Sequence, residues 1–212
     1  MWLTKFTHAC VRVERDGAVL VIDPGTFTEP AALDGVDAVL ITHEHADHLD
    51  VDKLAGALAR RPAVTVHTHP DVVPKLPALA GVVHPVTAGQ EFTAAGFAVR
   101  AYGGWHAQLH PDVPRVANLG FLVEESVYHP GDSFDVPAGA QVETLFVPIS
   151  GPWLKLAESV DFVRAVAPRR AYALHDCLLS EAGGKVYDAN LAKLAGCDYQ
   201  RLTPGSTVGA RL

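Results

Sequence analysis

Residues 37–48 read Asp-Ala-Val-Leu-Ile-Thr-His-Glu-His-Ala-Asp-His, and this stretch decides the fold. Its first half is a short apolar run typical of a buried β-strand. Its second half brings three imidazoles and the Asp47 carboxylate into six residues. A polar turn that merely caps a helix is the alternative, but such a turn does not need this composition. Imidazole and carboxylate suit Zn²⁺, Mn²⁺, Fe²⁺ and Ni²⁺, so we predict a metal site after a strand.

Strands and helices alternate on both sides of this stretch. Residues 9–14 and 18–22 predict a hairpin, and residues 50–61 predict a helix with Asp50 as its N-cap. Further strands are expected at 64–66, 82–83, 97–102, 119–123, 126–129, 144–147, 171–174 and 199–202, and helices at 70–76, 154–166 and 187–194. No linker divides the chain, so we expect one domain, residues 1–212, with two sheets packed face to face and helices outside.

The composition excludes several classes of protein. The 212 residues carry 17 Lys and Arg against 24 Asp and Glu, a net charge of −7 that argues against nucleic-acid binding. Three separated cysteines, Cys10, Cys177 and Cys197, make no disulfide framework and favour a reducing compartment. The chain shows neither a signal peptide nor an apolar run long enough to span a membrane. We therefore expect a cytoplasmic protein with a small-molecule substrate, and leave its oligomeric state open.

Further motifs follow predicted strands in a recognisable order. They are Asp23-Pro24, Gly104-Trp105-His106, Tyr128-His129-Pro130-Gly131-Asp132-Ser133 and Leu174-His175-Asp176. Together with the HxHxDH string at 43–48, they span essentially the whole chain and resemble the metallo-β-lactamase superfamily. This resemblance implies an α/β fold of the metallo-β-lactamase type, a four-layer αββα sandwich with a binuclear metal site at one edge of the two sheets.

The resemblance also implies a set of metal ligands. One metal would take His43, His45 and His106, the other would take Asp47, His48 and His175, and Asp132 would bridge them. Two divalent ions, with Zn²⁺ the first choice and Mn²⁺, Fe²⁺ or Ni²⁺ as alternatives, would share a hydroxide because metal binding lowers the pKa of water to about 7. We predict that this hydroxide attacks an ester, lactone or phosphodiester, with Asp47 and Asp132 as catalytic carboxylates and Asp47 as a proton shuttle.

Within the superfamily, the chain looks most like the compact group of ascorbate-6-phosphate lactonase and small metal-dependent hydrolases. Phe6-Thr7-His8-Ala9-Cys10-Val11 resembles the GHAS-type opening of that group, with Thr7 in place of Gly and Cys10 in place of Ser. One alternative is a metal-binding protein on the same fold without hydrolytic turnover. Another is oxygen or nitric-oxide chemistry at a di-iron site, which usually needs a flavin domain that does not fit in this length.

The remaining histidines and the aromatic residues carry weaker signals. His110 lies four residues after His106 in a Pro-containing loop, and we predict a catalytic or pocket-lining role for it. His8 is either a partner of a metal ligand or, the favoured interpretation, an ordinary buried polar residue. Trp105 and Trp153 either wall a substrate pocket or anchor the core. Ordinary structural roles are expected for His67, His69, His84, His129, the exposed Lys155 and Cys177 as a buried thiol.

Overall fold

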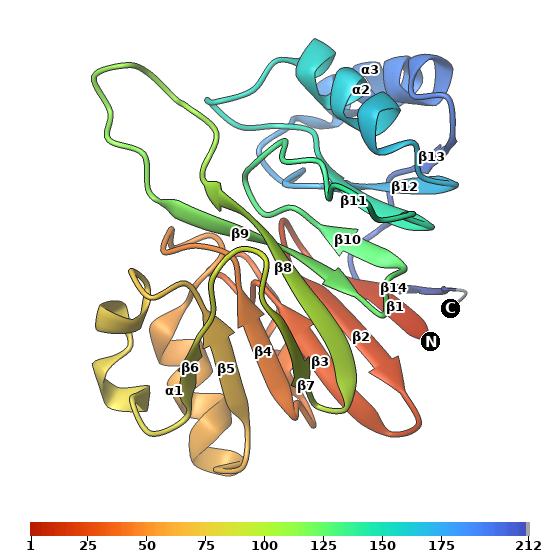
Figure 1. Ribbon diagram of the computed structural model, residues 1–212. Helices are drawn as coiled ribbons and strands as arrows, with labels where there is room; N and C mark the ends of the chain where they lie inside the picture. Colours follow the sequence, from red (N-terminus) through yellow and green to blue (C-terminus); the bar gives the residue numbers. More distant parts are fainter. Residues whose placement is uncertain (211–212) are drawn as a thin grey trace.

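The computed structural model describes residues 1–210, which form two mixed sheets of seven strands each (Figure 1). The first sheet has the order β14-β1-β2-β3-β4-β5-β6. Its strands are β1 (Trp2–Lys5), β2 (Val11–Arg15), β3 (Ala18–Ile22), β4 (Ala38–Ile41), β5 (Thr65–Thr68), β6 (Val83–Pro85) and β14 (Ser206–Gly209). The 3-10 turn η1 (Pro30–Leu33) and helix α1 (Val51–Arg60) connect strands of this sheet. Asp50 caps α1 as predicted, since its side chain accepts from Lys53 N at 2.9 Å.

The second sheet has the order β13-β12-β11-β10-β9-β8-β7. Its strands are β7 (Glu91–Ala94), β8 (Phe97–Trp105), β9 (Ala117–Val123), β10 (Val127–His129), β11 (Thr144–Pro148), β12 (Arg170–Leu174) and β13 (Asp198–Gln200). Helices α2 (Leu156–Val166) and α3 (Glu181–Leu194) lie over the β11–β13 side of this sheet, as Figure 1 shows. The strands β10, β11, β12 and β13 pair in parallel, so their carboxyl ends meet at one edge.

The main core fills the space between the two sheets. Alternate residues of β3 and β8, such as Leu20 and Phe97, point into this space and are fully buried. Two further apolar clusters lie under the helices, one with Leu54 of α1 on the first sheet and one with Phe162 of α2 on the second. This arrangement confirms the predicted αββα sandwich.

Three local predictions differ from the structure. Residues 70–76 were expected to be helical, but the 3-10 turns η2 (Val73–Lys75) and η3 (Pro77–Leu79) stand there, because closely spaced prolines interrupt the α-helical hydrogen bonds. The sequence pattern did not reveal the short strands β1, β7 and β14. Helix α3 begins at Glu181, six residues earlier than expected. The Gly183-Gly184 pair has low helix propensity, so the sequence pattern did not reveal the first turn of this helix.

Candidate metal centre

The predicted ligands lie in loops that leave the carboxyl ends of four strands. β4 leads into the loop with His43, His45, Asp47 and His48, and β8, β10 and β12 lead to His106, Asp132 and His175, respectively. The sandwich therefore brings together seven residues that span more than 130 positions of sequence.

Asp132 lies at the centre of this cluster and is 1% exposed. Its Oδ1 is 3.1 Å from His48 Nε2, and its Oδ2 is 3.1 Å from His175 Nε2. His106 Nε2 is 3.3 Å and His43 Nε2 3.8 Å from the same Oδ2. One carboxylate thus faces four imidazoles from three loops, the arrangement expected of a bridging ligand.

The ligand atoms fall into two groups, each with its atoms within 4.8 Å of one another. The first group is His43, His45, His106 and Asp132, and the second is His8, Asp47, His48 and His175. The division matches the one implied by the resemblance, with His8 added to the second group.

The donor atoms of this cluster fit divalent metal ions. His48 Nε2, Asp132 Oδ1 and both ring nitrogens of His175 are buried without a hydrogen-bond partner among the described residues. An unsatisfied buried polar atom costs roughly 1–3 kcal/mol, so evolution rarely leaves several together without a ligand. Neutral imidazoles and carboxylates are ligands that first-row divalent cations accept. The residues present therefore match the two-metal site that the fold implies.

The carboxylate of Asp132 and the imidazole of His48 each stabilise the charged form of the other. Burial opposes ionisation of Asp132, but the imidazoles of His48 and His175 outweigh it and hold the pKa of this carboxyl well below its ordinary value. Burial likewise opposes charge on His48, but Asp132 and Asp23 raise its pKa well above the ordinary value. The pKa of His43 is lowered, first by burial and then by His48. An ionised carboxylate at the centre is the form that binds a cation.

Asp23 supports the cluster from behind, and the sequence did not reveal this role. It is fully buried at the end of β3 and accepts hydrogen bonds from Thr42 N at 2.8 Å and Thr42 Oγ1 at 2.7 Å. His48 Nδ1 lies 2.7 Å from the Asp23 carboxylate, which keeps a proton on Nδ1 and turns Nε2 toward Asp132, so Nε2 is the atom at which a cation would replace a proton. The available signal was Asp23-Pro24-Gly25 directly after a buried strand. Gly25 is required there because a Cβ would overlap the Asp47 carbonyl.

His8 is also part of the cluster. It is fully buried, its φ of 69° lies in the left-handed region, and its Nε2 is 3.0 Å from Asp47 Oδ2. His8 is thus a buried and hydrogen-bonded residue, as the favoured interpretation expected, and its partner is the predicted ligand Asp47, as the alternative expected. Its Nδ1 is 3.0 Å from the Sγ of Cys177. Cys177 was expected to be buried, but it is an exposed residue, and partial burial of its thiol raises the pKa to about 11.

The structure does not bring His110 to the cluster. Its side chain is 60% exposed, and its Nδ1 accepts from Asp112 N at 3.2 Å within the same loop. Away from the cluster, His67 stacks on His84, with ring centroids 5.1 Å apart. His129 Nδ1 accepts from Gly131 N at 3.2 Å, beside the turn that carries Asp132, which is a structural role of the kind expected.

A cavity of about 230 Å³ opens onto both ligand groups. Trp153 walls it, with its ring centroid 5.4 Å from that of His106 and 5.7 Å from that of His175. Trp105 does not line this cavity and is 54% exposed. Of the two tryptophans considered as pocket walls, Trp153 alone has that position.

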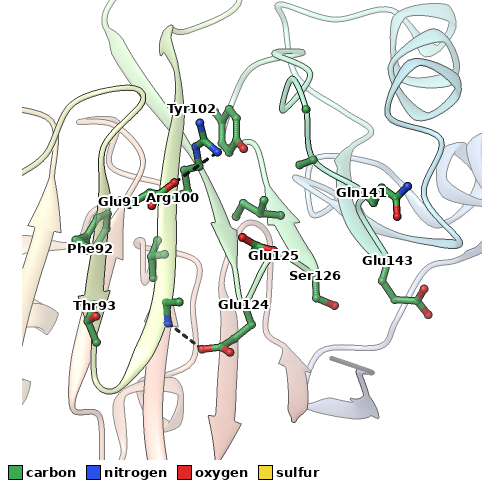
Figure 2. A pocket seen from close by; sticks show the side chains of 15 residues that line it. Glu91, Phe92, Thr93, Arg100, Tyr102, Glu124, Glu125, Ser126, Gln141 and Glu143 are labelled. Atoms are coloured by element: carbon green, nitrogen blue, oxygen red, sulfur yellow. Dashed lines mark hydrogen bonds and ion pairs between the residues drawn. The ribbon is translucent and has the colours of Figure 1, made fainter.

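A larger cavity of about 920 Å³ lies elsewhere, on the face of β7–β10 turned away from the inter-sheet core (Figure 2). Four glutamates line it, and arginines pair with two of them there: Glu91 with Arg100 at 3.5 Å, and Glu124 with Arg15 at 2.7 Å. None of the cluster's histidines or aspartates lines it. The smaller cavity is therefore the one that contains candidate metal ligands in its walls.

Within residues 1–210, no helix combines the length and apolar character needed to cross a bilayer.

Known proteins resemble this chain in sequence and fold. Residues 2–175 match the family model described as a β-lactamase superfamily domain. Protein Rv0786c of Mycobacterium tuberculosis is 38% identical over 98% of this chain and 99% of its own length. A UPF0173 metal-dependent hydrolase of Methanopyrus kandleri is 28% identical over 82% of this chain and 84% of its own. In fold, the chain is similar to Igni18, a metallo hydrolase from Ignicoccus hospitalis, with a TM-score of 0.75, 18% identity and coverage of 98% and 97%.

Proposed function

This chain belongs to the β-lactamase superfamily and is one of its metal-dependent hydrolases, and we propose that it cleaves an ester, lactone or phosphodiester of a small molecule at a binuclear centre. The observation that carries this proposal is the buried Asp132 carboxylate with four imidazoles around it. A site of this composition has no structural purpose in the sandwich, since apolar side chains would stabilise the same loops without unsatisfied polar atoms.

The ligands of the proposed centre are the seven residues that the fold brings together. His43, His45 and His106 would hold one divalent ion, and Asp47, His48 and His175 would hold the other. Asp132 lies near histidines of both groups and would be shared between them. Zn²⁺ is our first choice, and the same ligands accept Mn²⁺, Fe²⁺ or Ni²⁺. Such ions supply a Lewis acid for the carbonyl or phosphoryl oxygen and lower the pKa of water from about 16 to about 7.

The protein's own residues provide orientation and proton transfer. Asp47 lines the cavity, and its Oδ2 lies 3.0 Å from His8 and 3.3 Å from His175. Burial opposes ionisation of Asp47, but the nearby imidazoles of His175 and His8 outweigh it and lower its pKa far below the ordinary value. The carboxylate therefore stays ionised, which is the form that binds a cation. Its position in the wall of the cavity, and not its pKa, supports the proposed transfer of a proton to the leaving group. Trp153 lines the same cavity beside His106 and His175.

Metal removal and one substitution test the proposal. Chelated protein should lose hydrolysis of p-nitrophenyl esters, lactones and bis(p-nitrophenyl) phosphate, and Zn²⁺ or Mn²⁺ should restore it. Asp132→Ala should abolish turnover and reduce the number of bound metal ions, whereas Asp112→Ala, in the exposed loop, should do neither. Undiminished hydrolysis by the chelated protein would refute the proposal. Full metal content without turnover of any substrate would instead indicate a metal-binding protein that does not hydrolyse.

A further inference from the structure

Exposed apolar side chains gather at the mouth of the smaller cavity. Leu109 and Val113 come from the long loop between β8 and β9, which projects from the sandwich in Figure 1, and each is 42% exposed. Leu178, 52% exposed, comes from the loop after β12. Single exposed apolar residues are ordinary, but several that surround one opening mark a binding groove.

The loop that carries two of these side chains is fixed by its own hydrogen bonds. Gln108 Nε2 donates to the carbonyl of His110 at 2.6 Å and to that of Val113 at 3.0 Å. Val113 N donates to the same His110 carbonyl at 2.9 Å. The apolar groups are therefore in position before a substrate arrives, which reduces the entropy lost on binding.

Positive charge is scarce at the same opening. Arg115 is the one Lys or Arg among the described residues that line this cavity. Its Nε donates to the His106 carbonyl at 2.8 Å, and its guanidinium lies 5.8 Å from the centroid of the Trp105 ring. A phosphate monoester or sugar phosphate would therefore meet a single arginine at the mouth, with its Nε already used by the protein, beside three exposed apolar side chains.

We propose that the substrate carries an uncharged, apolar acyl or alkyl group next to the bond that is cleaved, and that Leu109, Val113 and Leu178 hold this group. The inference rests on the proposed function and narrows its substrate class: an apolar ester or lactone fits the opening better than a phosphorylated metabolite does. Trp153 forms the floor, beside the ligand histidines, where the reacting carbonyl would lie.

A chain-length series tests this specificity. We expect kcat/KM of the metal-loaded protein to rise about fourfold per methylene from p-nitrophenyl acetate through butyrate to hexanoate, because each CH₂ leaves water. p-Nitrophenyl phosphate should be the poorest substrate. Leu109→Ser and Leu178→Ser should each lower kcat/KM for hexanoate about tenfold and leave acetate nearly unchanged. The control is Leu194→Ser, an exposed leucine of α3 outside the cavity, which should change neither value.

A binding measurement separates this inference from the proposed function. Calorimetric titration of the metal-free protein should show that it binds hexanamide more tightly than acetamide. The Leu109→Ser variant should bind the two amides equally. If no ester or lactone is hydrolysed, the proposed function fails, and the titration still decides the apolar preference. Equal binding of the two amides, a kcat/KM that is flat or falls with chain length, or a preference for p-nitrophenyl phosphate would overturn the inference.

Discussion

The Asp23→Asn substitution tests the hydrogen bonds that Asp23 makes behind the cluster, because asparagine has almost the same shape as aspartate. Asp23 accepts three hydrogen bonds, from Thr42 N, Thr42 Oγ1 and His48 Nδ1. The asparagine side chain would keep one carbonyl oxygen, for Thr42 N, and would present an amide NH₂ where Oδ2 had been. His48 Nδ1 would then have to accept, so the ring proton would move to Nε2, the atom that faces Asp132 at 3.1 Å.

The size of the effect follows from the two consequences of this exchange. An imidazole protonated on Nε2 cannot bind a cation there, and loss of such a supporting partner typically costs 10–100-fold in metal affinity, or about 1.4–2.7 kcal/mol. Loss of one charged hydrogen bond should also lower the stability of the metal-free fold by about 1.5–3 kcal/mol.

Competition with a chromophoric chelator measures the first effect, and urea denaturation of the chelated protein measures the second. Asp37→Asn is the matched control, because Asp37 also accepts a backbone N–H, from Val19 at 2.9 Å, but lies away from the cluster. A folded Asp23→Asn protein whose Zn²⁺ affinity is within twofold of the wild type would refute the tautomer argument.

Three further perturbations have definite expected outcomes. His8→Ala removes the hydrogen bond to the Asp47 carboxylate, so one bound metal ion should be retained about tenfold more weakly, which equilibrium dialysis measures. Burial lowers the pKa of His67 from 6.5 to about 4, so the unfolded chain binds the proton more readily and stability should fall, by at most roughly 3 kcal/mol, as pH drops from 6.5 to 4. Urea titrations should show this slope flattened in His67→Phe, and an unchanged slope would contradict it. Gly131→Ala, at φ 63°, would collide with buried neighbours and should cost roughly 3–5 kcal/mol in thermal denaturation, whereas Gly89→Ala, at φ 85° with open space around it, should cost roughly 1–2.

The strand-plus-motif pattern predicted the sandwich, and the residues it proposed as ligands lie close together in the structure. Residues 38–41 form a strand because they are apolar and buried on both sides, and the polar string that follows must then lie at a sheet edge. The short strands escaped prediction because four residues carry too little periodicity. β1 depends on pairing with both β2 and β14, and β14 lies at the far end of the described chain.

Side-chain partnerships across the fold were harder to predict than the ligands. His8 and Asp47 are 39 positions apart, and Asp23 and His48 are 25 apart, so no local pattern connects either pair. His110 shows the opposite error, since its closeness in sequence to His106 suggested closeness in space. The loop instead turns its ring toward solvent and Asp112.

The position of Asp132 has a thermodynamic consequence for the proposed centre. Its two oxygens face different imidazoles, with Oδ1 toward His48 and Oδ2 toward His106 and His175, so the two ligand groups share one carboxylate. A cation bound in either group would change the effective charge and the orientation of the Asp132 carboxylate, which the other group also uses. The two loading steps are then linked, and by reciprocity the first ion alters the affinity for the second by the same factor whichever group fills first. Metal binding should therefore be cooperative, positively or negatively. A model of two identical, independent sites should fail to fit the metal-binding titration.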